Sequence, residues 1–552
     1  MDCPSQRDRL AIGECRLTIL HRKLRSQFPA SRVVGWDPHT RLATLATLSP
    51  KGARAVVRLF SCWAVNLLLR ESQSAIVNRK SAIPLAALTK LLLGFLLAAS
   101  TPSTSWTAEG KPDLIFVQAS GTAPAGIARR FPEGSRLVHF KPASGSGTVE
   151  DLTPDLFAAA DPQVSFDGTK VLFAGKQQKT SPWQIWEMGV EGSGRRQLTH
   201  CDVDCLRPAY LPRDEIVYTA LKLDDPTWPS QLYVSKGDGS DAHAITFGPG
   251  NFLVETVLQD GRILVSASAP LKPGIEGTRE LYTLRSDGSN LASFRCDHRP
   301  GLLRGEAAEL EDGSVLFVKK HSVAETGGEL AIVPRGSLHN SPIGLLLGLY
   351  VSVGRLEAGR AVVALKRPLP EKERSDLYSF DVAQGRIGET LFADSKLSSL
   401  DAVPVSSRTP PRWYWSTLNP QLKVGYFVCL NSRLSMDAPG GRFRSDIAKV
   451  RVLTLDAQNG LARRLGEAAV ETDGSFYIAV PPDQPVRFEL LNASGKSIHE
   501  QKGWIWTRSG EEHGCVGCHE DKAQAPDNSW PQALRRFDTP TRLGVEKPVS
   551  AH

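Results

Sequence analysis

The 552-residue sequence has only nine cysteines and three methionines, and it lacks an apolar run long enough to span a membrane. Six of the cysteines follow residue 100, so a disulfide framework is not expected to hold the fold together. The net charge is +7, but residues 1–100 hold 15 Lys and Arg against 5 Asp and Glu. The remaining residues hold 51 basic and 54 acidic side chains. Because the basic surplus is confined to the first hundred residues, no nucleic-acid partner is expected.

Residues 78–105 have the three parts of a secretory signal. Arg79 and Lys80 form a basic start, residues 91–99 are apolar, and Ala98 and Ser100 are small. The apolar run falls far short of the roughly 18 residues that a membrane helix needs, so we expect a cleaved signal rather than the alternative, an anchor. The mature chain should then have no stable membrane span, and its location should be periplasmic or otherwise extracytoplasmic.

The segment 1–77, which precedes this signal, is rich in Arg and has no clear apolar period. Export signals belong at the N-terminus, so we expect translation to begin near Val77. Residues 1–77 would then be an extension that results from a misassigned start site.

Residues 111–408 repeat a pair of hairpins. The first hairpin has a tight turn, often Asp-Gly, and it recurs as VSFDGTKVLFAG from Val164, AYLPRDEIVYTA from Ala209, TVLQDGRILVSA from Thr256, AELEDGSVLFVK from Ala308 and GRLEAGRAVVAL from Gly354. A second type, such as LYVSKGDGSDAHAIT from Leu232, lies between its copies. Alternating apolar residues around Asp-Gly predict hairpins, and two hairpins per unit make a four-stranded propeller blade.

Five blades are plain in the sequence, and a sixth is expected from the two ends of the region. We expect PDLIFV from Pro112 to pair with DAVPV from Asp401, because that pairing removes exposed sheet edges. The prediction is an all-β fold with a six-bladed propeller, and seven blades are the alternative. The repeats resemble those of TolB-type propellers, a resemblance that implies architecture only.

Residues 412–530 are expected to form a small β-sandwich that carries a cofactor motif, with a flexible tail at 531–552. The runs KVGYFVCLNSR, DIAKVRVLTLD and GSFYIAVPPDQPVRFELLNASGKS alternate apolar and polar residues between Pro and Gly turns. Trp504 and Trp506, in WIW, would share one face of a strand. Two alternatives stay open for this pair: packing against a porphyrin, or filling the core of the sandwich.

The segment EEHGCVGCHEDK from Glu511 places a histidine directly after a Cys-x-x-Cys pair. A structural zinc site would need two more ligands at short spacing, and a thioredoxin-like pair would need a βαβ unit. Neither is present in the sequence. The pattern indicates one covalent haem c, with thioethers from Cys515 and Cys518 and with His519 as the proximal iron ligand. A free or disulfide-bonded pair with an incidental histidine is the plain alternative.

The sixth ligand of the iron has only weak candidates, Met436 and His499. No tyrosine follows Tyr477 and no methionine follows Met436. This scarcity slightly favours a haem with an open or weakly ligated face, which suits reaction with a small ligand. A haem with both faces ligated would instead suit electron transfer.

Residues 466–528, from GEAAVETDGSFYIAV to GCVGCHEDKAQAPDN, resemble the haem-bearing middle domain of the hydrazine synthase alpha subunit family. The order of signal, propeller, sandwich and CxxCH also agrees, so the resemblance covers essentially the whole mature chain. In that family the two cysteines bind haem c, and the alpha subunit works in a complex that makes hydrazine from nitric oxide and ammonium. The family's synthases carry a second haem domain, whereas this sequence has one CxxCH. The resemblance therefore implies a haem protein more strongly than it implies hydrazine synthesis.

We therefore expect an exported mono-haem c-type cytochrome that performs haem-based redox chemistry or electron transfer on small nitrogen or oxygen compounds. An electron-transfer partner or other haem-protein subunits are expected with it. The alternative is a non-catalytic envelope propeller, for binding or scaffolding, with a structural or electron-carrying haem.

The segment HCDVDC leaves two further questions open. Cys201 and Cys205 form either a small disulfide or two thiols, and Asp202 and Asp204 either bind a cation or lie in a solvated loop.

Overall fold

The computed structural model describes residues 111–545 with gaps at 122, 126–127, 144–146, 224–228, 269–277, 295–301, 323–324, 338–340, 344–348, 368–373, 436–437, 444–445, 457–459, 502 and 519–528. The expected signal peptide and the segment before it lie outside the described residues. The described part of the chain is all β and has no α-helix, in agreement with the predicted fold class. It contains two short 3-10 turns, η3 (Pro439–Gly441) and η4 (Gln532–Leu534).

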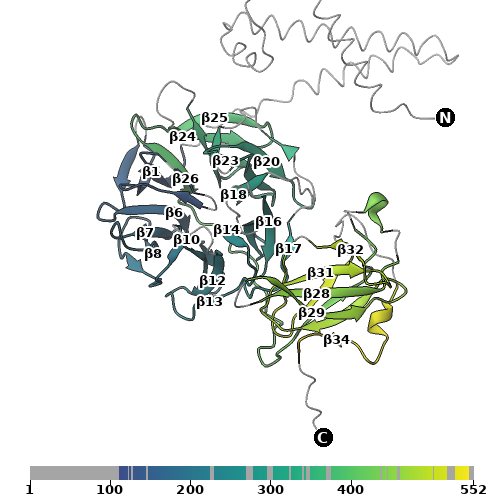
Figure 1. The fold of residues 1–552 in the computed structure, drawn as a ribbon. Coiled ribbons are helices and arrows are strands. Elements are labelled where there is room, and N and C mark those ends of the chain that lie inside the picture. Colours follow the sequence, from purple (N-terminus) through teal and green to yellow (C-terminus); the bar gives the residue numbers. More distant parts are fainter. Residues whose placement is uncertain are drawn as a thin grey trace, which may run out of the picture. The chain divides into compact units, whose positions relative to one another are not determined.

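Six blades of four strands each make up the first part of the described chain (Figure 1), and two of them are joined into one eight-stranded sheet by a parallel pairing of Arg279 with Leu303. Five blades follow the order of the chain. The first contains β6 (Ala158–Val164), β7 (Lys170–Lys176), β8 (Gln184–Gly189) and β9 (Arg196–Gln197), and the second contains β10 (Asp204–Leu211), β11 (Glu215–Leu221), β12 (Gln231–Lys236) and β13 (His243–Ala244). The third contains β14 (Asn251–Val257), β15 (Ile263–Ser268), β16 (Arg279–Leu284) and β17 (Ala292–Ser293), the fourth contains β18 (Leu303–Glu309), β19 (Val315–Lys320), β20 (Glu329–Val333) and β21 (Ser341–Pro342), and the fifth contains β22 (Tyr350–Arg355), β23 (Arg360–Lys366), β24 (Ser375–Asp381) and β25 (Arg386–Phe392).

The sixth blade combines both ends of the region, as predicted. It contains β26 (Ser398–Pro404), β1 (Leu114–Ala119), β4 (Arg136–Lys141) and β5 (Thr148–Asp151), in that order. Strand β1 pairs antiparallel with β26, with Leu114 opposite Pro404 and Ile115 opposite Val403. A separate small hairpin joins β2 (Ala123–Ala125) to β3 (Ala128–Arg130). The blade count is therefore six, and the predicted pairing of the two ends is confirmed.

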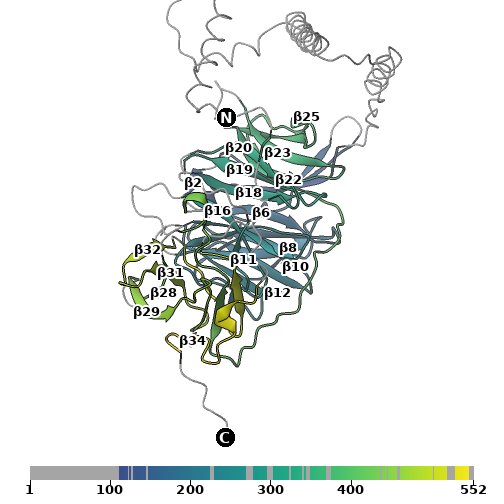
Figure 2. The same cartoon turned by 90° about the vertical axis from the view of Figure 1, so that its right-hand side faces the viewer.

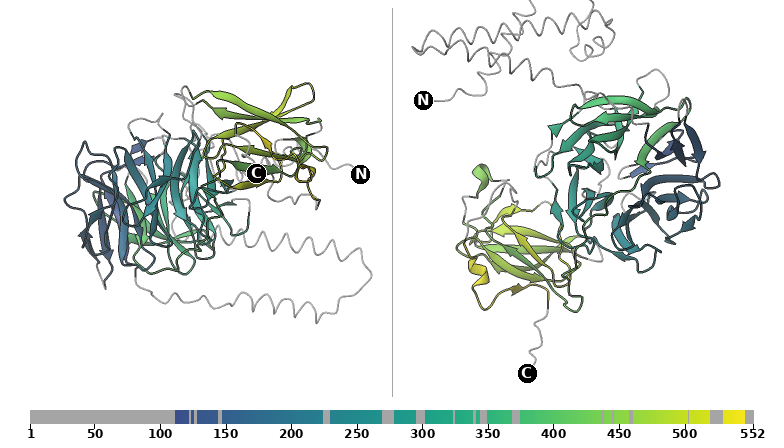
Figure 3. Two further views of the ribbon diagram at one scale, coloured as in Figure 1. Left: turned by 90° about the horizontal axis from the view of Figure 1, so that it is seen from below. Right: turned by 180° about the vertical axis from the view of Figure 1, so that it is seen from behind.

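The blades pack face to face through apolar side chains, which explains the unbroken apolar runs of their middle strands. The largest fully buried side chains of the propeller include Phe116, Phe173, Tyr218, Phe317 and Phe380. Each full burial of such a side chain contributes about 1.5–3 kcal/mol to the hydrophobic stabilisation. The right-hand view of Figure 3 shows the blades arranged around a common centre.

The innermost strand of every blade has a β-bulge at an equivalent place. The register of β6, β10, β14, β18, β22 and β26 against the neighbouring strand breaks at this point in all six blades. Four bulge residues have left-handed backbone angles, namely Asp161 (φ 54), Arg207 (φ 50), Glu306 (φ 51) and Asp401 (φ 52). Such bulges redirect a side chain out of the alternating pattern. Here they direct charged side chains towards a cavity at the centre of the blades.

The linker after β26 runs along one face of the propeller. Arg408 N–H donates to the carbonyl of Phe166, and Arg412 N–H donates to the carbonyl of Gln259. Gly261 has φ +89, and a Cβ on it would lie 2.1 Å from the carbonyl oxygen of Arg412. A side chain at this position would displace the linker, so the glycine permits the close approach.

The second part of the described chain is a two-layer β-sandwich (Figure 2). One sheet has the order β33 (Glu512–Cys515), β27 (Gly425–Cys429), β30 (Phe476–Val480) and β34 (Thr541–Arg542), and the other has the order β29 (Ala462–Ala469), β28 (Lys449–Leu455), β31 (Val486–Leu491) and β32 (Ser497–Glu500). Between them lies the sandwich core, which includes Phe427, Val450, Ile478, Phe488 and Leu490. Leu543, after β34, contacts Gly466 of β29, so these two strands occupy matching edges. Strands β32 and β33 therefore lie at the opposite edges.

Within the segment expected to be a flexible tail, residues 531–545 are described and contain η4 and a short strand. Strand β34 pairs with β30, and Leu543 is buried in the sandwich core. The Asp473 carboxylate accepts a hydrogen bond from Gln532 N–H at 2.8 Å, and Ser475 Oγ accepts one from Ala533 N–H at 3.0 Å. The turn after β29 thus holds residues 532 and 533 in place. The tail segment has too few apolar residues for a strand to be predicted from its sequence.

Candidate functional site

The CxxC motif lies at the end of an edge strand and is fixed by its backbone. Strand β33 runs parallel to β27, with Cys515 opposite Cys429. Leu430 N–H donates to the carbonyl of Cys515 at 2.9 Å, and Cys518 N–H donates to the carbonyl of Leu434 at 3.0 Å. Both ends of the motif are therefore tied to the segment that follows β27.

The side chains of the motif lie half-buried at the rim of the sandwich core. Cys515 and Cys518 both pack against that core. Cys429 is buried beside them and belongs to the core itself. Two thiols that are held in place and still partly exposed are accessible for a covalent bond to a ligand at this edge.

Gly517 and Gly514 differ in what surrounds them, and this difference makes a test. A Cβ on Gly517 would lie 2.4 Å from the carbonyl oxygen of Leu434, whereas a Cβ on Gly514 would meet nothing within 4 Å. We expect Gly517→Ala to destabilise the sandwich by about 1–3 kcal/mol, because the backbone must move to relieve the overlap. Gly514→Ala, the matched control, should leave the urea midpoint of unfolding nearly unchanged. Equal midpoints for the two variants would contradict the described packing.

The expected iron ligand His519 and the candidate Met436 lie outside the described residues. Ser435, which precedes Met436, is described, and the nearby Leu434 carbonyl accepts a hydrogen bond from Cys518 N–H. The other candidate, His499, lies on β32, and its ring centroid is 5.1 Å from that of Phe443. Phe443 N–H in turn donates to the carbonyl of Arg433. Leu434 and Phe443, which lie on either side of the gap at 436–437, therefore contact the motif and His499, respectively.

His513 is a neighbour of the motif that is already engaged within the protein. Its ring lies 5.4 Å from that of Phe427, and its Nδ1 lies 3.5 Å from a Glu511 carboxylate oxygen. Burial opposes the charge on this imidazole, but hydrogen bonds with Cys515 and Glu511 outweigh it and raise the pKa of His513 to about 10. These contacts hold His513 within the sandwich.

Trp506 and Trp504 have separate environments. Trp506 is 1% exposed and lies in a cluster with propeller residues rather than in the sandwich core. Its indole Nε1–H donates to the carbonyl of Gly288 at 3.1 Å, and its ring meets that of Phe252 edge to face at 5.6 Å. Neither alternative expected from the sequence describes Trp506. Trp504 is half-buried beneath the Arg487 guanidinium, which is 4.8 Å from its ring centroid.

The HCDVDC segment has a structural role in the first two blades. Asp204 accepts hydrogen bonds from Trp183 N–H at 3.0 Å and Leu223 N–H at 3.1 Å. Cys201 and Cys205 are free thiols in contact, and the hydrogen bond from Cys205 lowers the pKa of Cys201 to about 7. No group of three or more His, Cys, Asp and Glu side chains suited to a metal ion occurs among the described residues.

The charged bulge residues are what the sequence interpretation missed. A charged side chain interrupts the apolar inner strand at the same place in five of the six blades, as Asp161, Arg207, Glu255, Glu306 and Asp401. An alignment of the repeats on their inner strands, rather than on their turns, would have shown this recurring charged position.

No described helix is long and apolar enough to cross a membrane.

The fold and the motif define a class of protein, a β-propeller joined to a β-sandwich that presents a CxxC pair on an edge strand. Residues 443–520 match the family model for the hydrazine synthase alpha subunit middle domain. Hydrazine synthase subunit alpha of Kuenenia stuttgartiensis is 23% identical over an alignment 575 positions long. The alignment covers 77% of this chain and 69% of that protein. The sequence therefore relates this chain to the hydrazine synthase alpha subunit, and the predicted resemblance is confirmed.

Comparison with solved structures supports the fold. The hydrazine synthase structure of K. stuttgartiensis superposes with a TM-score of 0.66 at 20% identity, covering 77% of this chain and 71% of that one. TolB from Acinetobacter baumannii superposes with a TM-score of 0.39 at 13% identity, covering 53% of this chain and 67% of that one. The first likeness extends to both the propeller and the sandwich, since it covers more of the chain than either part alone.

Proposed function

We propose that this chain is an exported mono-haem c-type cytochrome, related to the hydrazine synthase alpha subunit, that performs haem-based redox chemistry or electron transfer with small nitrogen or oxygen compounds. The observation that carries the proposal is the half-buried CxxC pair, which begins at Cys515, the last residue of β33, within the segment that matches the middle domain. His519 follows the pair directly in the sequence. This order of residues is typical of covalent haem attachment.

Open space and an apolar rim beside the motif support this proposal. Next to Cys515, a Cβ placed on Gly514 would meet no atom of the described residues within 4 Å, which leaves space for a ligand. Cys515 and Cys518 would hold the group by thioethers, and His519 would ligate its iron. The haem, once bound, would supply a one-electron redox centre whose potential depends on its axial ligands and on its exposure. The apolar rim of the sandwich core beneath the cysteines would exclude water from one side of it.

The role of the rest of the chain in this proposal is to position the motif. Glu511 precedes β33, and one of its carboxylate oxygens accepts a hydrogen bond from Asn290 N–H of the propeller at 2.8 Å. The other oxygen accepts one from Arg508 N–H at 2.7 Å. The start of the haem-bearing strand is therefore tied to the third consecutive blade, so the propeller orients the proposed haem site.

Partner subunits form part of the proposal. The curated relative is named as a subunit of hydrazine synthase. A chain of the same architecture with one CxxCH motif would exchange electrons with another redox protein. We also propose that the segment near residues 78–105 exports the chain. Mass spectrometry of the protein from a periplasmic fraction should then find no peptides from residues 1–77.

The experiment that tests the haem is expression in a bacterium that matures cytochromes c. The purified wild-type protein should keep its haem through a denaturing gel and stain for peroxidase activity. The variant with Cys515→Ala and Cys518→Ala should lose covalent haem completely. The control with Cys201→Ala and Cys205→Ala should keep it, because those thiols lie in the propeller. A colourless wild-type protein would refute the proposal.

Carbon monoxide separates the two kinds of chemistry. A shift of the reduced spectrum with carbon monoxide is expected, because an open or weakly ligated iron binds it. If the spectrum does not shift, reaction at the haem is excluded and the electron-transfer function remains. His499→Ala and Met436→Ala then identify which side chain ligates the iron.

A further inference from the structure

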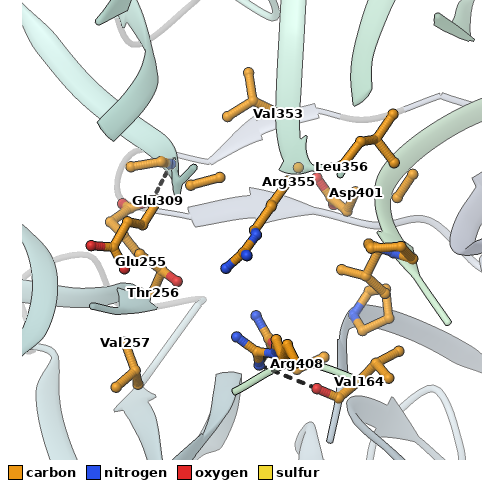
Figure 4. Close-up of a pocket in the computed structure, with 18 of the residues that line it drawn as sticks. Val164, Glu255, Thr256, Val257, Glu309, Val353, Arg355, Leu356, Asp401 and Arg408 are labelled. Atoms are coloured by element: carbon orange, nitrogen blue, oxygen red, sulfur yellow. Dashed lines mark hydrogen bonds between the residues drawn. The ribbon is translucent and has the colours of Figure 1, made fainter. Parts of the chain in front are cut away.

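A cavity of about 360 Å³ lies at the centre of the propeller. The inner strands β6, β10, β14, β18, β22 and β26 all contribute to its wall, and linker residues 406–409 complete it. Figure 4 shows side chains from several blades converging on this space. The cavity is separate from the CxxC motif, so a ligand could bind there whether or not the chain carries the proposed haem.

At one end of the cavity a buried arginine, Arg207, is paired with two carboxylates. Arg207 Nη1 lies 3.0 Å from a Glu255 carboxylate oxygen, and its Nη2 lies 2.8 Å from one of Glu306. The Arg207 backbone N–H donates to Asp161 at 3.0 Å. Burial opposes the charge of this guanidinium, but Glu306, Glu255, Asp161 and Asp401 together raise the pKa of Arg207 above its usual value. The carboxylates at this end therefore already have a cation.

The other end holds two guanidinium groups that face the cavity from opposite sides. Figure 4 shows Arg355 reaching in from the end of β22 and Arg408 reaching in from the linker. Arg408 donates to neutral acceptors, the Gln163 side chain at 3.1 Å and the Val164 carbonyl at 3.3 Å. Among the described residues no carboxylate forms an ion pair with it. Burial, and then the charge of Arg355, lower the pKa of Arg408 to about 10.

The nearby acidic groups offset this pair only weakly. Arg355 Nη2 lies 3.6 Å from a Glu311 oxygen, and both side chains are at least 32% exposed, so water screens the contact. Glu357 is exposed at the mouth of the cavity. One Glu309 oxygen accepts a hydrogen bond from the backbone N–H of Gln259, and burial raises the pKa of this carboxyl.

We propose that the cavity binds one small anion, a carboxylate or an inorganic oxyanion, between the guanidinium groups of Arg355 and Arg408. Two like charges that face one cavity repel each other, and an anion between them relieves that repulsion while it accepts charge-assisted hydrogen bonds from both. Planar guanidinium groups suit ligands with at least two terminal oxygens. The volume of the cavity admits ligands of several non-hydrogen atoms.

A cation is the competing ligand, because carboxylates outnumber arginines along the wall. The structure favours the anion for two reasons. The carboxylates at the Arg207 end are already paired, and no described group of three acidic or metal-binding side chains is suited to a cation. Arg355 and Arg408, by contrast, have no buried carboxylate within ion-pair distance among the described residues.

Calorimetric titration of the full-length protein tests the proposal. Sodium acetate and succinate represent the carboxylates, sodium phosphate and sulfate represent the inorganic oxyanions, and all titrations are run at one ionic strength. At least one of the four should bind at a single site, and the class that binds identifies the source of the ligand. Arg408→Gln should weaken binding about tenfold or more, because one charge-assisted contact is lost. Arg355→Gln should weaken it similarly.

Controls keep this result interpretable. Arg386 is exposed on β25, so Arg386→Gln should bind the same anion with unchanged affinity. Arg408→Gln should fold normally, because it removes a buried charge next to another cation, and its far-ultraviolet circular dichroism should match wild type. Its haem content should also be unchanged. Absence of binding by all four anions, undiminished binding by Arg408→Gln, or binding of calcium chloride at this site instead would each overturn the proposal.

Discussion

Arg207→Met should lower the free energy of unfolding of the propeller by about 3–5 kcal/mol, since it removes one partner from a buried ionic group. Arg207 is 14% exposed, and the carboxylates that it contacts, Glu255 and Glu306, are 1% and 13% exposed. A shift of the urea midpoint, followed by far-ultraviolet circular dichroism, measures the effect. Methionine has a similar length, so the loss reflects charge rather than a cavity.

The size of this loss follows from what the arginine leaves behind. Its removal leaves two carboxylates close together at the centre of the blades. Arg279 is also buried near both of them, and burial lowers its pKa below the usual value, an effect that Glu255 counteracts. A single buried arginine would then face two anions in a medium that screens charge poorly. Arg279 therefore limits the damage without abolishing it.

The matched variants separate charge from packing. Adding Glu255→Gln and Glu306→Gln to Arg207→Met should recover most of the lost stability, because neutral side chains no longer need a buried cation. Arg386→Met, on the exposed face of β25, should change the free energy of unfolding by less than about 0.5 kcal/mol. If the triple variant is no more stable than Arg207→Met alone, the ionic explanation fails.

The hairpins of the propeller could be predicted because their determinants are local. Asp167 illustrates this: its carboxylate accepts hydrogen bonds from Thr169 N–H at 3.0 Å and from the Ser165 hydroxyl at 2.6 Å, all within one turn. These hydrogen bonds lower the pKa of Asp167 to about 2. The pairing of β1 with β26 could also be predicted, since two strands without partners at the ends of a repeat array need one another.

The bulges could not be predicted from the period-2 pattern, because a bulge breaks that pattern by one residue. Around Arg207 the register passes directly from Leu206 to Ala209. Each inner strand alone therefore looks like an apolar strand with one misplaced charge. The charge is recognised as a shared feature only because it recurs in successive blades. The residues that neutralise it lie in other blades, as Glu255 and Glu306 do for Arg207.

In the sandwich, the central strands could be predicted and the edge strands could not. Strands β27, β28, β30 and β31 coincide with the alternating runs seen in the sequence. Strand β33 contains only Glu512–Cys515, and it exists because β27 provides a parallel partner. A four-residue segment with a glycine has no pattern of its own. The geometry of the candidate haem site thus depends on a pairing between residues 425–429 and 512–515.

Trp506→Ala should destabilise the protein by about 3–5 kcal/mol, the cost of truncating a fully buried aromatic side chain. The indole contacts Phe252 edge to face at 5.6 Å and Phe247 at 6.0 Å, and its Nε1–H satisfies the carbonyl of Gly288. The variant would leave a cavity and an unpaired buried acceptor. The urea midpoint, followed by circular dichroism, should fall accordingly.

Trp504→Ala is the matched control, because it changes the same residue type two positions away. Trp504 is half-buried, and its ring lies 4.8 Å from the Arg487 guanidinium. Loss of a cation–π contact at such a site costs about 0.5–1 kcal/mol. The two variants should therefore differ by a factor of about three or more in lost stability. A similar loss in both would mean that Trp506 does not anchor the sandwich to the propeller.

The contacts of Trp506 also predict which strands should lose protection from hydrogen exchange in Trp506→Ala. Trp506 and Arg508 both contact the propeller, the latter through the Ala244 carbonyl at 3.4 Å, and Glu511 binds Asn290 N–H just before β33. Trp506→Ala should therefore loosen the start of β33 as well as lower the midpoint. Hydrogen exchange should rise at Glu512–Cys515 while β28 and β31, which lie in the other sheet, stay protected. Unchanged exchange in β33 would show that its pairing with β27 alone holds the CxxC motif in place.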